Sequence, residues 1–114
     1  MQPAPLPPSD FGLVMHALSD ATRRSVYERL VQSGEAAVVE LTRAGSVSQP
    51  AVSQHLKLLR EAGLVTERRQ GRTVRYRARP EGLAPLVDWL GLYGAFWRDR
   101  FDALRTTLKE IDPR

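Results

Sequence analysis

Apolar residues recur at intervals of three and four in the first third of the chain, the spacing of amphipathic helices. One helix is expected near residues 10–18, and a second is expected to begin after Asp20 and to stop at Gly34. A shorter third helix over residues 38–44 precedes a predicted turn at Gly45-Ser46. In the first helix the spacing is carried by Phe11, Val14, Met15 and Leu18. The positions expected to face inward in the next two helices are Val26, Leu30, Val31, Val38, Leu41 and Ala44.

A fourth predicted helix follows, and its ends are well marked. Ser48 is a natural N-cap, Pro50 falls in the first turn, where a missing N–H costs nothing, and Gly63 suits a left-handed C-cap. At about 100° per residue, the apolar residues and His55 gather on one side. The other side is polar and carries almost no acid; it consists of Gln49, Pro50, Ser53, Gln54, Lys57 and Arg60.

Residues 64–69 and 73–79 form two short runs separated by Gln70-Gly71-Arg72, a pattern that predicts a β-hairpin. In the second run Val74, Tyr76 and Ala78 alternate with arginines, so one face is apolar and the other cationic. The expected fold is mainly α with a small β-hairpin wing, a winged helix-turn-helix.

The last apolar stripe is long and broad, and it predicts one unbroken helix over about residues 83–111. Five of the eight aromatic residues of the chain lie there, more apolar surface than one small domain covers. We interpret the surplus as a dimer interface; the alternative is a helix wholly buried within one subunit. The interface residues expected from this helix are Leu86, Trp89, Leu90, Tyr93, Phe96, Trp97, Phe101 and Leu104.

Positive charge is concentrated in residues 43–79, where nine arginines or lysines face only Glu61 and Glu67, a net of +7. The whole chain carries +4, so the remainder is net −3. A local cationic face on a slightly acidic body indicates a directional polyanion partner, and double-stranded DNA fits best. The hairpin charges have a simpler alternative, a solvated edge strand that resists aggregation, but six arginines within twelve residues fit it poorly.

A helix fits the DNA major groove, where Gln49, Ser53 and Gln54 could read base edges. Ser48, Lys57 and Arg60 suit phosphates, and the hairpin arginines suit phosphates or an adjacent minor groove. The predicted DNA-contacting residues are Ser48, Gln49, Pro50, Ser53, Gln54, Lys57, Arg60, Arg72, Thr73, Arg75 and Arg77.

Composition removes several classes of function. The chain has no cysteine and only two histidines, so neither a thiolate site nor a histidine cluster is expected, and His55 is interpreted as structural. No catalytic motif is present, so we expect no enzyme, no metal and no cofactor. Residues 1–9 are expected to be an extended or disordered proline-rich leader, and residues 10–114 one DNA-binding domain. No apolar run approaches a membrane span, so a cytoplasmic location without a membrane partner is expected.

Three segments also carry a family resemblance: residues 18–24 (LSDATRR), residues 48–65 (SQPAVSQHLKLLREAGLV) and residues 71–76 (GRTVRY). With them the chain resembles the ArsR/SmtB family of bacterial winged-helix repressors. The resemblance implies five helices with the hairpin between the fourth and the fifth, and a homodimer held by the first helix, with Phe11, and the last. It also implies an autoregulatory repressor on an inverted-repeat operator, released by an inducer.

The chain departs from this family where metal-sensing members bind their ions. Ala37 and Val39 stand where the thiolates of arsenic and cadmium sensors would be, and residues 83–114 contain no histidine of the kind that zinc and nickel sensors use. The resemblance therefore implies a repressor that lacks these metal sites, with an unknown small-molecule effector left open. The main alternative is a winged-helix module whose basic face binds an acidic protein; a metal-sensing repressor and an enzyme rank below it.

Overall fold

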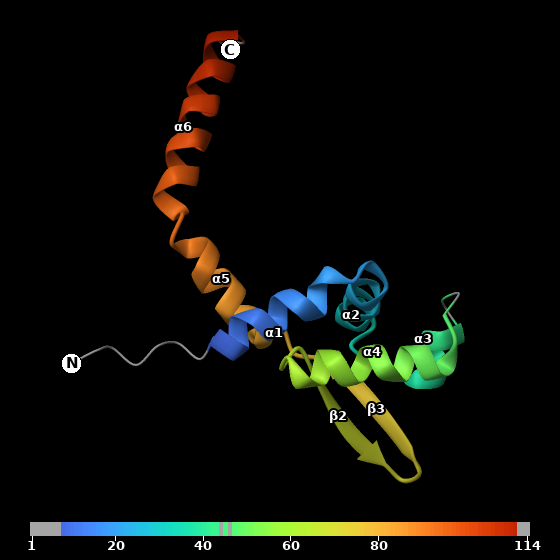
Figure 1. Ribbon diagram of the computed structural model, residues 1–114. Helices are drawn as coiled ribbons and strands as arrows, with labels where there is room; N and C mark the ends of the chain where they lie inside the picture. Colours follow the sequence, from blue (N-terminus) through green and yellow to red (C-terminus); the bar gives the residue numbers. More distant parts are fainter. Residues whose placement is uncertain (1–7, 44, 46, 112–114) are drawn as a thin grey trace, which may run out of the picture.

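The computed structural model describes residues 8–43, 45 and 47–111 of the chain (Figure 1). Helices dominate, and the strands form one small sheet. The elements are α1 (Pro8–Ser19), α2 (Ala21–Ser33), β1 (Glu35–Ala37), α3 (Val38–Arg43), α4 (Gln49–Glu61), β2 (Val65–Gln70), β3 (Thr73–Ala78), a 3₁₀ turn η1 (Pro80–Leu83), α5 (Ala84–Gly91) and α6 (Gly94–Ile111).

The sheet is antiparallel and has the strand order β1-β3-β2. Strands β2 and β3 form the predicted hairpin, which turns at Gly71 with a φ of 63°. Strand β1 was not predicted from the sequence, because three residues are too few to show an alternating pattern. It pairs with β3, placing Ala36 opposite Tyr76, so the hairpin is anchored along one edge to the segment that leads into α3.

The core lies between α1, α2, α4 and the base of the sheet. Its largest fully buried side chains are Val14, Leu30, Val52, Leu56, Leu59, Leu64 and Val65. Arg23 is buried among them, and its guanidinium has hydrogen-bond partners. Its Nε donates to the carbonyl of Ala17 at 2.7 Å, and its Nη1 lies 3.4 Å from His55 Nδ1. His55 therefore joins α4 to α2 as a structural residue.

The predicted ends of the fourth helix are confirmed. The Ser48 hydroxyl accepts a hydrogen bond from the backbone N–H of Ala51 at 3.3 Å, and Gly63 follows the helix with a φ of 78°. Helix α3 ends at Arg43 and Ala44 lies outside the described residues, as does Ser46 of the predicted turn. Helix α1 begins at Pro8, within the predicted leader, because proline is well tolerated in a first turn; residues 1–7 lie outside the description.

The prediction of one unbroken last helix was wrong. The segment is divided into η1, α5 and α6, with a break at Leu92 and Tyr93. There the backbone N–H of Leu92 donates to Trp89 and that of Tyr93 to Leu90, one residue short of the α-helical spacing. Gly91 and Gly94 flank the break, and glycine costs about 1 kcal/mol in a helix relative to alanine.

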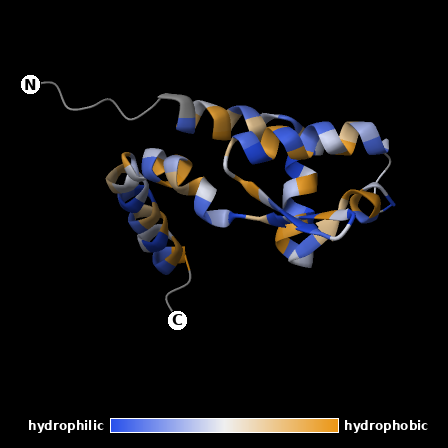
Figure 2. Ribbon diagram, turned by 90° about the horizontal axis from the view of Figure 1, so that it is seen from below, coloured by the Kyte–Doolittle hydropathy of each residue, from blue (hydrophilic) through white to orange (hydrophobic). Residues whose placement is uncertain are grey.

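Helix α6 stands away from the other elements in both views (Figures 1 and 2). It has no buried residue, although hydrophobic positions occur along its length (Figure 2). Across the described ranges, every helix is too short or too polar to cross a bilayer.

Candidate nucleic-acid interface

The outer face of α4 is open along its whole length. Its N-terminal half carries Gln49, Pro50, Ser53 and Gln54, all exposed, and Lys57 follows one turn later. The buried side chains of the helix, Val52, Leu56 and Leu59, point into the core on the opposite side. Packing therefore fixes which side chains α4 presents. Near the N-terminus these side chains are uncharged, and all of them except that of Pro50 are polar.

The tip of the hairpin, which we call the wing tip, comprises residues 69–73. All five residues are exposed, and the hairpin projects from the body below α4 (Figure 1). Arg69 and Arg72 lie there, and no ion pair within the described residues involves either guanidinium. Ten of the eleven residues predicted to contact DNA are exposed on α4 and the hairpin.

Arg75 is the exception, and the structure gives it other partners. Its side chain is 27% exposed, with Nε 2.9 Å from Glu35 Oε1 and Nη1 3.2 Å from Glu40 Oε1. Glu35 Oε1 also lies 2.6 Å from Arg68 Nη2. Sequence reasoning missed both glutamates because they lie thirty-three to forty residues from their partners. Glu35 also lies in β1, the strand that was not predicted, and Glu40 follows in α3.

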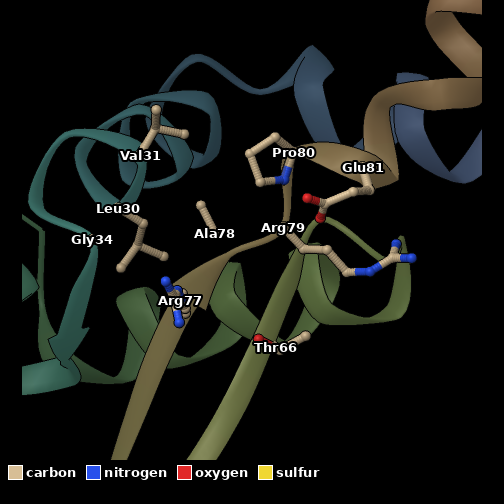
Figure 3. Close-up of a pocket in the computed structure, with 9 residues that line it drawn as sticks. All are labelled: Leu30, Val31, Gly34, Thr66, Arg77, Ala78, Arg79, Pro80 and Glu81. Atoms are coloured by element: carbon tan, nitrogen blue, oxygen red, sulfur yellow. The ribbon is translucent and has the colours of Figure 1, made fainter.

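Arg60 and Arg77 also lie in different surroundings from the arginines of the wing tip. Arg60 Nη1 forms an ion pair with Glu67 Oε2 at 2.8 Å, joining α4 to β2. Arg77 lies at the base of the hairpin beside Gly34 and Leu30, where it lines a cavity at the C-terminal end of α2 (Figure 3). Two of the predicted phosphate contacts thus lie close to the body of the protein, far from the wing tip.

The surroundings of the hairpin base shift the pKa values of two groups, Glu35 and Tyr76. The Arg68 guanidinium, with Arg75 beside it, lowers the pKa of Glu35, so this carboxylate keeps its charge to a lower pH than a free glutamate does. Burial, and then the nearby Glu67 carboxylate, raises the pKa of Tyr76. Each face of the hairpin base therefore has a carboxylate paired with an arginine: Glu35 with Arg68 on one face and Glu67 with Arg60 on the other.

A second exposed surface runs along α5 and α6, and we call it the apolar face. Trp89 is 39% and Trp97 49% exposed. Its aromatic rings contact one another in tilted or edge-on pairs and form two groups. Trp89 lies 5.3 Å from both Tyr93 and Phe11 of α1 between ring centroids, and Trp97 lies 5.2 Å from Phe96 and 6.3 Å from Phe101. The predicted interface residues all lie on or beside it, with Leu86 and Phe11 half-buried and Leu90, Tyr93, Phe96, Phe101 and Leu104 exposed.

No cluster of three or more potential metal ligands occurs within residues 8–43, 45 and 47–111. Ala37 and Val39, the positions where the family resemblance would place thiolates, lie at the junction of β1 and α3.

Comparison with known proteins agrees with this architecture. A helix-turn-helix domain model matches residues 18–68. The HTH-type transcriptional regulator Rv2034 of Mycobacterium tuberculosis is 53% identical over 70 residues, which cover 61% of this chain and 64% of that protein. The chain spans about half to two thirds of the length of the first curated relatives that it matches, 54%, 64% and 54%.

A solved structure decides the family. The ArsR-like transcriptional regulator from Rhodococcus sp. RHA1 superposes with a TM-score of 0.67 at 32% identity, over 91% of this chain and 93% of that one. The chain belongs to the ArsR/SmtB family. ArsR/SmtB proteins are transcriptional regulators with a winged helix-turn-helix fold, and they are not enzymes.

A second solved structure, of a possible ArsR-family transcriptional regulator, is a homodimer. The homodimeric winged helix-turn-helix DNA-binding domain of Mb0332 from Mycobacterium bovis, a fragment of residues 1–100, superposes with a TM-score of 0.61 at 25% identity. The match covers 82% of this chain and 91% of that one.

Proposed function

We propose that this ArsR/SmtB protein is a homodimeric, sequence-specific DNA-binding repressor that regulates its own operon. The observation that carries this proposal is the outer face of α4, which is polar, exposed and almost free of acid beside a cationic wing tip. A surface of this composition suits the major groove and the phosphates that flank it.

Different residues have different tasks in this proposal. Gln49, Ser53 and Gln54 read base edges. Glutamine can form two hydrogen bonds with adenine, and the serine hydroxyl can donate to or accept from several bases. Lys57, Arg72, Ser48 and the N-terminus of α4 bind phosphates and set the register. Pro50, which has no N–H to donate, lies in the first turn of α4 beside them. Thr73 lies next to Arg72 at the wing tip and supports its contact.

The apolar face on α5, α6 and Phe11 supports the homodimer. Exposing this many aromatic side chains to water costs free energy, and a second copy of the chain would cover them. The homodimeric structure of the Mb0332 domain supports the same arrangement. A twofold dimer requires an operator with inverted half-sites about one helical turn, ~10 bp, apart or a multiple of it.

We infer further that the repressor does not respond to thiolate-bound metals and that it acts in the cytoplasm. The absence of cysteine throughout the chain supports the first inference. An inducer, if one acts, is then a small molecule or a partner of another kind.

The proposal is tested by binding to the DNA upstream of its own gene over a range of salt. Neutralising ~6–10 phosphates should lower the affinity by about 10³–10⁵ between 50 and 200 mM salt. A duplex of the same length and shuffled sequence is the control, and it should bind more weakly at every salt concentration. Equal, shallow salt dependence on both duplexes would refute DNA reading and favour the alternative, an acidic protein partner for the basic face.

A further inference from the structure

One carboxylate lies at the centre of the hairpin base. Glu35 Oε1 accepts hydrogen bonds from Arg68 Nη2 at 2.6 Å and from Arg75 Nε at 2.9 Å. Arg68 is on β2 and Arg75 is opposite it on β3, while Glu35 is on β1. A single side chain therefore joins all the strands of the sheet.

The same network reaches α3, which with α4 forms the pair of helices that we take as the helix-turn-helix. Arg75 Nη1 donates to Glu40 Oε1 at 3.2 Å, and that oxygen also accepts from the backbone N–H of Ala37 at 3.3 Å. The carboxylates of Glu35 and Glu40 thus hold Arg75 between the sheet and the start of α3.

The other face of the hairpin is tied to α4. Glu67 and Arg68 are neighbours on β2, so their side chains point to opposite faces of the sheet. Glu67 holds Arg60 of α4 at 2.8 Å on its face, whereas Arg68 meets Glu35 on the other. Both helices of the helix-turn-helix are therefore connected to the hairpin base through ion pairs.

We propose that Glu35 is a positioning residue that fixes the hairpin relative to α3 and α4, so that Arg72 at the wing tip meets DNA at a set distance from α4. On this proposal Arg68 and Arg75 hold the hairpin in position and do not bind phosphates. This inference rests on the proposed DNA-binding function, and it replaces the sequence-based prediction for Arg75.

The electrostatics of the site explain why Glu35 matters more than an ordinary surface partner. Isolated exposed ion pairs contribute little, but here one carboxylate, 26% exposed, serves two guanidiniums. Without its charge, Arg68 and Arg75 become like charges directly opposite each other on paired strands, an unfavourable arrangement. The hairpin would then sample more orientations, and DNA binding would have to order it again.

The test is DNA affinity of the full chain with Glu35→Gln, which removes the charge and keeps the size. DNA binding must then order the loosened hairpin, and this cost should weaken operator binding by the variant roughly three- to ten-fold. Glu35→Asp keeps the carboxylate and should recover part of the loss. Glu110→Gln on α6 changes the net charge equally at an exposed position far from the hairpin, and it should bind as the wild type does.

A double-mutant cycle with Arg72→Ala separates positioning from general stability. If Glu35 acts by placing Arg72, Glu35→Gln should cost much less affinity once Arg72 is gone, so the two fold-losses do not multiply. Thermal unfolding of each variant confirms that it is folded. Should Glu35→Gln fail to fold, Glu40→Gln, which removes only one contact of Arg75, should show a smaller loss with the same non-additivity.

Unchanged or tighter operator binding by Glu35→Gln would overturn the inference, since freed arginines would then be neutral or would bind phosphates. Losses that multiply with Arg72→Ala would also overturn it. Failure of the wild type itself to prefer the operator over the shuffled duplex would refute the proposed function, and this role for Glu35 with it.

Discussion

At the scale of single residues, Gly82 shows how closely the segment after the hairpin approaches the end of α4. Gly82 is buried in η1, and a Cβ added to it would collide with the backbone carbonyl group of Gly63 and lie 3.2 Å from Leu64 Cα. Backbone atoms cannot turn aside as a flexible side chain can. The position therefore requires glycine for its size, and its φ is not in the left-handed region.

We expect Gly82→Ala to lower the free energy of unfolding by about 1–3 kcal/mol, as other overpacking substitutions do. Urea denaturation at a fixed chain concentration measures the change. Gly12→Ala is the matched control, because an added methyl there meets nothing within 4 Å and helix α1 should gain about 0.5–1 kcal/mol. Equal stability of Gly82→Ala and wild type would contradict the close approach.

Residues whose roles depend on near neighbours could be predicted from the sequence. Ser48 and Gly63 were assigned correctly because capping is decided within one turn of helix. The partner of Arg75 could not be predicted, since Glu35 is forty residues away and pairing depends on the sheet register. Alternation along β3 placed the arginines on one face correctly, but it could not show which of them meet carboxylates.

At the scale of elements, the C-terminal segment shows the limit of periodicity. The apolar stripe along residues 83–111 predicted helix, and most of the segment is helical. Periodicity did not reveal the break at Leu92 and Tyr93, because both residues continue the apolar pattern. Gly91 and Gly94 on either side disfavour the helical conformation. The break sets α6 at an angle to α5 (Figure 1), so the apolar face is divided between two helices.

Trp97 on α6 provides a test of that face. Trp97→Ala removes a side chain that is half-exposed in the single chain and, on our proposal, buried in the dimer. Dimerisation should weaken, and operator affinity should fall with it although Trp97 lies far from α4 and the wing tip. Sedimentation equilibrium and DNA titration of the same samples measure both.

Thr106→Ala is the control for this experiment, since residue 106 lies nine positions from Trp97, on the opposite side of α6. It should leave dimerisation and DNA affinity unchanged. A Trp97→Ala variant that still dimerises and binds with wild-type affinity would show that the apolar face has another purpose.

At the scale of the whole molecule, two surfaces of different character lie on separate parts of the fold. The cationic, polar surface of α4 and the wing tip is built on the core, and the apolar face extends from it on α5 and α6 (Figures 1 and 2). A second copy covering the apolar face would hold the two α4 helices and the two wing tips at a fixed distance and orientation. The affinity of the dimer would then depend on both surfaces, and its sequence preference on α4 alone.

The most direct test of DNA reading by α4 is selection of preferred sites from a pool of random duplexes by wild type and by Gln54→Ala. Gln32→Ala, at an exposed position near the end of α2, is the control and should select the wild-type sites. We expect wild type to select an inverted repeat and Gln54→Ala to lose preference at one base pair of each half-site, a change worth about 1–3 kcal/mol of discrimination. Selection of the same sites by Gln54→Ala and wild type, or no enrichment by either, would contradict the proposal that α4 reads DNA.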